Sequence, residues 1–294
     1  MSISIAQKIR AASLLLLSGL FWTACQKEPS SDLLPTPEPG ADNCRMDTFL
    51  QGLGAASNMD SIYSFVYDEA GYPFKIYETD EISQETDSMV ISYLPDHRIQ
   101  KISYLCPDPV TFEFTYSGQN ITRIKYLFSQ NITYPDSTVI VYEYNTAVNK
   151  PSVKKIYDYE NGATGNIDPS SVFEFTYNDA GDIVQRKEYD QNGNLAGTIT
   201  CTYTNQPNSF SMMGMMGELY NLYDPMSWCF KEAWWSTHNL NTVDRVDGQN
   251  NVISHTEMHY EINDKSQVIR AQATTRYPDG EQFDFHYSFG YKCN

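Results

Sequence analysis

Residues 173–189 read FEFTYNDAGDIVQRKEY, and this stretch decides the fold class. Phe173, Phe175 and Tyr177 alternate with polar side chains, which is the period of two of a half-buried β-strand. Residues 178–181 supply side chains that bond the local backbone, and a glycine that is free to take a positive φ. Residues 183–189 then return with β-branched and charged side chains. The stretch therefore predicts a β-hairpin with one buried face.

The same unit recurs at 64–77, 91–104, 112–126, 139–157 and 258–271. The first strands of the units end in tyrosines: Tyr67, Tyr93, Tyr116, Tyr144, Tyr177, Tyr203, Tyr260 and Tyr287. Because a lone hairpin is only marginally stable, consecutive hairpins must join into one sheet. We therefore expect an all-β fold: a curved antiparallel meander sheet or a partly closed barrel.

Composition supports this fold class and excludes one class of function. The chain has 294 residues, with 37 acidic residues against 20 Lys and Arg, and 22 of its residues are Tyr. Tyrosine enrichment favours strands. The formal net charge of −17 argues against nucleic-acid binding, which needs a cationic surface.

The first residues predict export and lipid anchoring. Residues 1–24 have a basic start and a short apolar run, 11–22, which is typical of a secretory signal peptide. Cys25 follows Thr23-Ala24 and resembles the lipidated cysteine of a bacterial lipobox; the alternative is an ordinary signal that leaves Cys25 unmodified. Residues 25–43 are proline-rich and favour an extended tether. Several acyl chains would hold the mature chain to a membrane effectively permanently.

Residues 44–294 are expected to form a single β domain, interrupted by an insertion at 209–240 that is rich in Met and Trp. We expect the insertion to pack on the concave face of the sheet, because pliable Met side chains fill irregular gaps. The alternative is an exposed aromatic platform for a ligand such as a glycan. That hypothesis names Tyr220, Tyr223, Trp228, Trp234 and Trp235 as ligand-binding residues.

Five cysteines remain if Cys25 is lipidated, so they cannot all pair within the chain. Export permits disulfides, but the spacings name no pairs, and we expect at most two bridges. Cys201 and Cys293 share strand parity with apolar neighbours. We therefore expect both to be buried, unreactive side chains.

Signatures of catalysis are missing from the sequence, which contains no G-x-S-x-G, H-E-x-x-H, P-loop or G-x-G-x-x-G motif. His255 and His259 share a strand face, but they lie about 13 Å apart at strand rise, too far for one ion. We therefore expect no catalytic residue, metal or cofactor. The charged run Arg186-Lys187-Glu188 places charge on both faces of one strand, which argues against a membrane-spanning barrel.

The lipobox, the tether and the Tyr-Asp-x-x-Gly hairpins together resemble a Bacteroidetes lipoprotein family of unknown function with a porin-like β fold. The hairpins are also similar to the YD repeats of large surface and toxin-shell proteins. The resemblance spans most of 60–294, with 236–260 as its best stretch. It implies a fold and a location at the outer membrane, on the cell surface or the periplasmic face, and transfers no catalytic residues.

These observations favour a non-catalytic binding or accessory protein, anchored to the membrane at Cys25, with a glycan or a protein as its partner. One alternative is a glycoside hydrolase-type enzyme that uses two converging carboxylates. Another is a structural component of the envelope.

Overall fold

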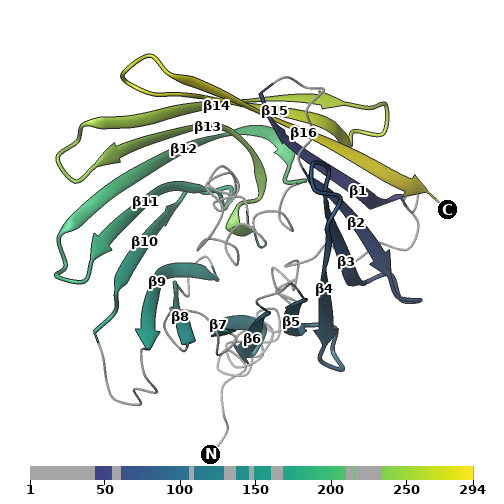
Figure 1. Ribbon diagram of the computed structural model, residues 1–294. Helices are drawn as coiled ribbons and strands as arrows, with labels where there is room; N and C mark the ends of the chain where they lie inside the picture. The colour runs from purple at the N-terminus through teal and green to yellow at the C-terminus, as the bar shows by residue number, and fades with distance from the viewer. Residues whose placement is uncertain are drawn as a thin grey trace, which may run out of the picture. The chain divides into compact units, whose positions relative to one another are not determined.

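The computed structural model describes residues 44–54, 61–105, 109–128, 137–145, 149–159, 168–209, 215 and 234–293, all of which lie in one compact unit. These residues form sixteen strands (Figure 1). The strands are β1 (Cys44–Leu53), β2 (Ser61–Tyr67), β3 (Pro73–Asp80), β4 (Thr86–Tyr93), β5 (Ile99–Leu105), β6 (Val110–Ser117), β7 (Asn120–Phe128), β8 (Ser137–Asn145), β9 (Lys150–Tyr159), β10 (Ser171–Tyr177), β11 (Ile183–Asp190), β12 (Leu195–Pro207), β13 (His238–Asp247), β14 (Val252–Ile262), β15 (Val268–Arg276) and β16 (Gln282–Cys293).

The strands form one closed barrel in which each strand pairs with its neighbours in sequence. The last strand, β16, returns to the first, β1, with antiparallel partners that run from Cys44↔Cys293 to Leu53↔Phe285. The all-β prediction is confirmed, and the barrel is fully closed. Closure leaves no unpaired sheet edge, which open meanders must protect in other ways. Within the described residues, no helix has the length and apolar character needed to cross a membrane.

Most of the described hairpin turns share one geometry. In seven turns the first residue donates its N–H to the carbonyl of the fifth, and the fourth donates to the carbonyl of the first; they begin at 68, 94, 178, 190, 247, 263 and 277. This is a three-residue loop whose last residue is left-handed. Gly71 and Gly181 take that position at φ 94° and 86°, and Asn250 takes it at 68°. The first position favours Asp or Asn, because Asp190 Oδ1 accepts the N–H groups of both Asn192 and Asn194 at 2.8 Å.

Eight tyrosines near one end of the barrel link each hairpin to the hairpin before it. We call this set the tyrosine girdle: Tyr67, Tyr93, Tyr116, Tyr144, Tyr177, Tyr203, Tyr260 and Tyr291. Seven of them donate their hydroxyl to a backbone carbonyl of the preceding strand, at 2.5–2.9 Å. The hydroxyl of the eighth, Tyr144 on β8, forms a hydrogen bond with the backbone of Ile121 on β7. The repeated tyrosine is therefore a tie between successive hairpins.

One member of the girdle was assigned wrongly from the sequence. Tyr287 was expected to end the last first-strand, but it is 1% exposed and belongs to the core. Tyr291 takes the girdle position and donates to the carbonyl of Val268 at 2.9 Å. Because β16 carries an aromatic residue at every second position from 283 to 291, alternation alone does not show which tyrosine reaches the neighbouring strand.

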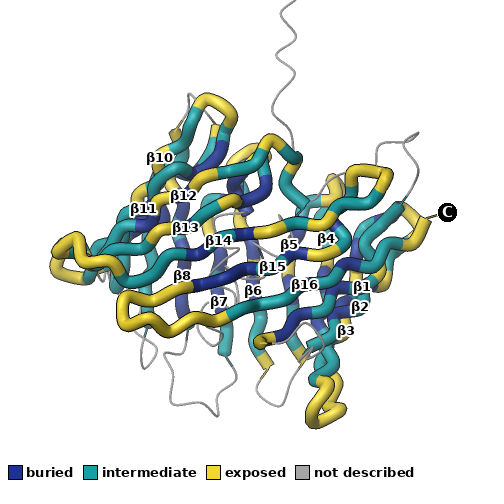
Figure 2. Tube along the Cα trace, turned by 90° about the horizontal axis from the view of Figure 1, so that it is seen from above, coloured by how far each residue is buried: buried dark blue, intermediate teal, exposed yellow. Residues whose placement is uncertain are grey.

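The interior of the barrel is packed with apolar side chains. Inward-facing residues such as Phe49, Ile124 and Ala273 are fully buried and belong to one cluster, and buried segments recur on strand after strand around the barrel (Figure 2). Met215 and Trp234, from the insertion between β12 and β13, belong to the same cluster. These described residues of the insertion therefore pack inside the barrel, in agreement with the expected concave-face packing.

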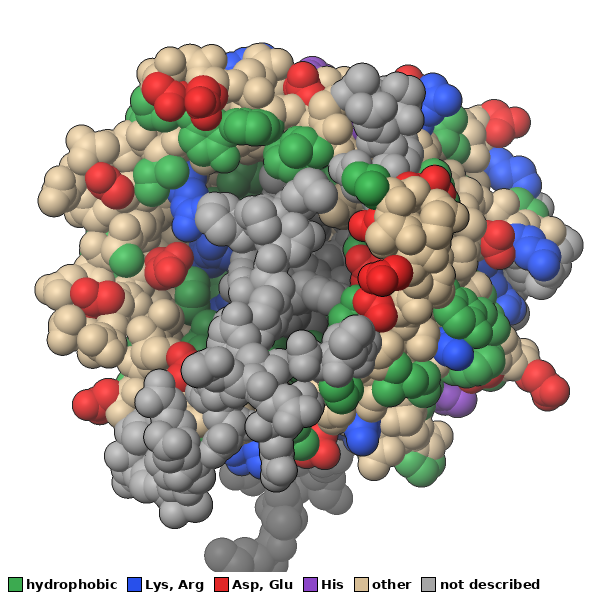
Figure 3. Space-filling view, viewed as in Figure 1, with side chains coloured by type: hydrophobic (Ala, Val, Ile, Leu, Met, Phe, Trp, Pro, Cys, Tyr) green, Lys and Arg blue, Asp and Glu red, His purple; other side chains and the backbone are tan. Residues whose placement is uncertain are grey.

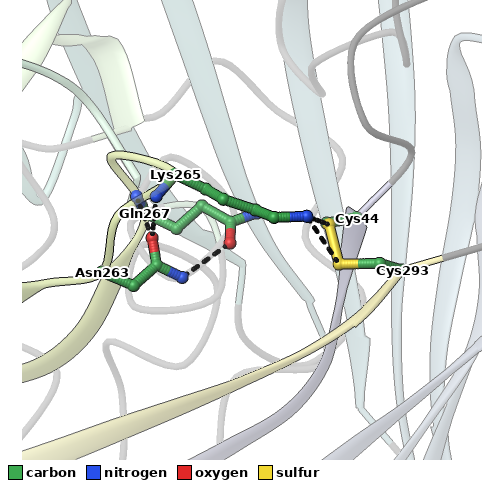
Figure 4. The surroundings of a disulfide bond; sticks show 5 residues. All are labelled: Cys44, Asn263, Lys265, Gln267 and Cys293. Atoms are coloured by element: carbon green, nitrogen blue, oxygen red, sulfur yellow. Dashed lines mark hydrogen bonds between the residues drawn. A yellow bond between two sulfur atoms is a disulfide. The ribbon is translucent and has the colours of Figure 1, made fainter.

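A disulfide joins the first residue of β1 to the penultimate residue of the chain. Cys44 and Cys293 are bonded, and Lys265 Nζ donates to both sulfur atoms at 3.7 and 3.9 Å (Figure 4). The expectation that Cys293 is a buried apolar side chain is wrong, because it is exposed and bonded. Cys201 is buried, as predicted. The bond staples the seam at which the barrel closes.

Candidate functional site

The predicted ligand-binding residues divide into two groups. Trp234 and Trp235 are described, and they are 3% and 8% exposed. Tyr220, Tyr223 and Trp228 lie outside the described residues, as does the lipidation candidate Cys25.

Trp234 and Trp235 pack against the barrel wall. Their rings stack on one another with centroids 4.5 Å apart, and the Tyr142 ring on β8 meets Trp235 edge-on at 5.5 Å. In this structure neither indole presents a face to water. Ligand binding by these residues stays a prediction, and it would require the pair to move out of the core.

A polar network fixes the segment that follows the two tryptophans. Lys150 Nζ, at the start of β9, donates to the carbonyl of Trp235 at 2.6 Å and to that of Gly181 at 2.5 Å. Asp182 is 2% exposed, and its Oδ1 accepts the N–H groups of Thr237 and His238 at 2.8 Å. Its Oδ2 lies 2.9 Å from His238 Nδ1.

This network holds the segment after the two tryptophans in place, and we call it the latch. Burial alone would raise the pKa of Asp182, but the hydrogen bonds from His238 and Thr237 outweigh it and lower that pKa. The nearby Ser236 hydroxyl donates to Tyr203 and accepts from the Ile183 N–H, so it is not aligned with the histidine as a nucleophile would be. The insertion is thereby tied to the turn between β10 and β11.

The inner wall of β2 to β5 carries a second polar group, which we call the acid–tyrosine cluster: Tyr63, Glu78, Asp87 and Tyr104. Tyr63, Glu78 and Asp87 are successive register partners on neighbouring strands, so their side chains share one face. Tyr63 donates to Glu78 at 2.7 Å. The Tyr104 hydroxyl lies 3.0 Å from a Glu78 oxygen and 3.1 Å from an Asp87 oxygen.

The cluster brings two carboxylates together around one hydroxyl. Burial raises the pKa of Tyr104 far above its usual value, and the charges of Glu78 and Asp87 raise it further. Tyr104 is therefore a neutral donor at every physiological pH. The two carboxylate oxygens each lie about 3 Å from one hydroxyl oxygen, so they are at most about 6 Å apart, a range that includes the ~5–5.5 Å separation of the carboxylates in retaining glycosidases.

The inner wall of β9 to β11 carries buried cations instead. Lys154 is 1% exposed, and its Nζ lies 4.2 Å from the centre of the Phe173 ring. The Arg186 guanidinium approaches the same ring at 5.5 Å. This sector of the inner wall is not purely basic, because Asp158 on β9 accepts a hydrogen bond from the buried Thr138 hydroxyl at 2.6 Å. Figure 3 shows Lys and Arg at the left of the opening, and Asp and Glu on both sides of it.

The outer wall is polar and charged. Register pairs place Glu113 beside Lys125 and Glu174 beside Lys187 on the outward face, and Glu143 forms an ion pair with Lys155. A membrane-spanning barrel has the opposite arrangement, with an apolar outer band and a polar lumen, and a basic side chain at the bilayer midplane costs about 2–4 kcal/mol. The side-chain pattern therefore places the outer face of these strands in water.

One histidine on the outer wall, His255, lies beside acidic side chains. His255 Nδ1 lies 2.6 Å from Asp244 Oδ1, and this hydrogen bond raises the pKa of His255. Glu257 lies between His255 and Arg276. Among the described residues, no group of three or more His, Cys, Asp or Glu side chains is arranged to hold a metal ion.

Sequence reasoning did not single out the acid–tyrosine cluster. Glu78 lies in a strand with no motif around it, and its pairing with Asp87 depends on the register that the β3–β4 turn sets. The only available signal was parity, because Glu78 and Ile76 lie on the same face of β3.

Comparison with known proteins supports the fold. No protein-family model matches the chain, and no curated protein matches its sequence. A porin-like protein from Bacteroides uniformis ATCC 8492 matches in structure with a TM-score of 0.56 and 11% identity, over 84% of this chain and 96% of that chain. This likeness shows that the two chains share a porin-like barrel fold.

Two further solved structures are similar over much of the chain. A porin-like protein from Bacteroides vulgatus ATCC 8482 has a TM-score of 0.47 and 12% identity, over 84% of this chain and 98% of that chain. The Photorhabdus luminescens Tc holotoxin pore has a TM-score of 0.25 and 12% identity, over 75% of this chain and 14% of that chain. At these TM-scores neither carries an argument about this protein.

Proposed function

We propose that this chain is a lipid-anchored, exported protein of the outer membrane, and that its barrel is a non-catalytic binding or accessory module. The charged outer wall carries the proposal, because a barrel with that surface needs a separate device to stay at a membrane. Cys25 and the tether that follows it supply such a device.

The tightly packed interior supports a module rather than a pore. In the described part of the chain, core aromatics and Trp234 form one buried apolar cluster on the inner side of the wall, whereas a porin leaves an aqueous channel there. A glycan or protein partner would therefore bind outside the lumen, at the outer wall or at the turns.

The anchor is tested by feeding cells an alkyne analogue of palmitate and comparing the chain with a Cys25→Ala variant. We expect label on the wild-type chain, none on the variant, and release of the variant from the membrane fraction. Unlabelled wild-type protein would contradict the anchor. The binding role is tested with a glycan array and with cross-linking in intact cells; failure of both would contradict it.

A second candidate function is glycoside hydrolysis, which is favoured by the shared contact of Glu78 and Asp87 with Tyr104. A panel of nitrophenyl glycosides tests it. Hydrolysis that falls about 10²–10⁴-fold in Glu78→Gln but not in the outer-wall control Glu113→Gln would establish it. A wild-type protein that cleaves none of the panel, at any pH from 4 to 9, would remove it.

A further inference from the structure

One sector of the outer wall differs in charge from the rest. On the outward-facing positions of β2 to β5, which we call the β2–β5 face, there is no Asp or Glu. The acidic residues of these four strands lie elsewhere: Glu78 and Asp87 face inward, and Asp80 accepts hydrogen bonds within the β3–β4 turn. The outward positions carry two lysines, Lys75 and Lys101.

Outward-facing acidic residues occur on strands elsewhere in the described wall. Glu113, Glu174, Asp244, Glu257 and Asp284 occupy outward positions on β6, β10, β13, β14 and β16. In a chain of net charge −17, an acid-free sector four strands wide is the part of the wall that an anionic surface repels least.

The β2–β5 face also exposes apolar side chains. Val66, Phe74, Tyr77 and Leu105 are 36%, 39%, 37% and 52% exposed, which is four of the nine exposed large apolar side chains among the described residues. Lys75 Nζ lies 4.4 Å from the centre of the Tyr77 ring. Figure 3 shows hydrophobic side chains gathered on the right of the barrel, over β2 to β4.

We propose that the barrel turns the β2–β5 face toward the lipid surface that holds its anchor; this inference rests on the proposed lipidation of Cys25. Aromatic rings and lysines favour the boundary between water and lipid, where the ring meets the headgroups and the lysine stem lies along apolar surface. The strands of the sector offer both, and none of their outward positions carries an acid that would repel lipid phosphates.

The path of the chain supports a lipid surface as the partner of the β2–β5 face. β1 begins at Cys44 and pairs with β2, so the tether enters the barrel beside the β2–β5 face. Eighteen residues separate Cys25 from Cys44, and a proline-rich segment of that length reaches about 55 Å at ~3.1 Å per residue. The anchor therefore keeps the face at a high effective concentration near lipid, so weak contacts suffice to orient the barrel.

Hydroxyl-radical footprinting of the full lipidated chain tests the proposal, in vesicles of phosphatidylethanolamine and phosphatidylglycerol and in detergent. Phe74 and Tyr77 are matched in exposure by two aromatic residues outside the β2–β5 face, Phe283 on β16 and Tyr277 in the β15–β16 turn, which are 40% and 37% exposed. We expect vesicles to lower oxidation of the first pair relative to the second. Equal oxidation of the two pairs in vesicles would overturn the proposal.

Charge reversal on the β2–β5 face provides a second test in the same footprinting experiment. Lys75→Glu/Lys101→Glu is expected to reduce the ratio of docked to undocked barrel by about 30-fold or more, since each lysine near an anionic surface contributes ~1 kcal/mol. The control Lys125→Glu, on β7, is expected to leave the footprint unchanged. A double variant that remains as protected as the wild type would also overturn the proposal.

Three further outcomes separate the alternatives. Protection of Phe74 in whole cells but not in protein-free vesicles would replace the lipid surface with a protein partner. Mass spectrometry that finds Cys25 unmodified would defeat the anchor itself, and this inference with it. A lipidated Cys25 with an unprotected Phe74 defeats only the inference.

Discussion

Replacing a single girdle tyrosine tests whether the repeated residue ties the hairpins together. In Tyr177→Phe the ring keeps its packing and its contact with Lys150, whose Nζ lies 5.6 Å from the ring centre. Only the hydrogen bond to the carbonyl of Pro151, 2.9 Å long, is removed. Because Pro151 is buried, its carbonyl loses a donor that water does not easily replace.

We expect Tyr177→Phe to lower the free energy of unfolding by about 1–1.5 kcal/mol. For a domain of this size that corresponds to roughly 2–4 °C in Tm for each kcal/mol. The control is Tyr77→Phe, because Tyr77 is 37% exposed and lies outside the girdle. Urea unfolding followed by tryptophan fluorescence measures both. A Tyr177→Phe variant as stable as Tyr77→Phe would refute the tie.

Adding Tyr93→Phe and Tyr260→Phe extends the test. These girdle tyrosines lie on β4 and β14, well separated from Tyr177 on β10, so their effects are expected to add. The triple variant should lose about 3–4 kcal/mol. Strongly sub-additive losses would contradict an independent tie at each hairpin.

Three further predictions concern pH, redox state and a turn. Burial raises the pKa of Tyr67 to about 12, so its contribution to stability is complete below the unfolded value near 10 and is lost as pH rises to 12; absorbance at 295 nm should show ionisation together with unfolding. Replacing Cys44 and Cys293 with Ser opens a bridge between residues 249 apart, and chain entropy predicts a loss of about 5 kcal/mol, measured by urea unfolding. A Cβ at Gly181 would lie 2.9 Å from Thr237 Oγ1, whereas one at Gly193 would meet nothing, so Gly181→Ala should lower Tm more than Gly193→Ala.

Much of the fold follows from local chemistry. In 173–189 the alternation gives the buried face, and Asn178 with Gly181 gives the turn. Closure of the barrel is a global property, because it depends on how β16 meets β1 after all the other strands have paired. No local sequence pattern indicates that β16 pairs with β1, so the Cys44–Cys293 bond could not be predicted either.

The candidate site was harder to predict than the fold. The tryptophan pair was visible in composition, but its burial depends on the latch that Asp182 and Lys150 make with a segment more than fifty residues away. The acid–tyrosine cluster joins four strands through register alone. The spacing of Glu78 and Asp87 in the sequence does not predict their contact, because both lie in strands without a distinguishing motif.

The adjacent residues Lys154 and Lys155 test the central claim most directly, that the barrel has a packed interior and an outer wall in water. Lys154 is 1% exposed inside the barrel, and Lys155 lies outside, 2.5 Å from Glu143. A membrane-impermeant amine reagent, applied to the full chain in lipid vesicles and read by mass spectrometry, should modify Lys155 and spare Lys154. Modification of Lys154 with protection of Lys155 is the result expected of a membrane-spanning barrel, and it would contradict this account.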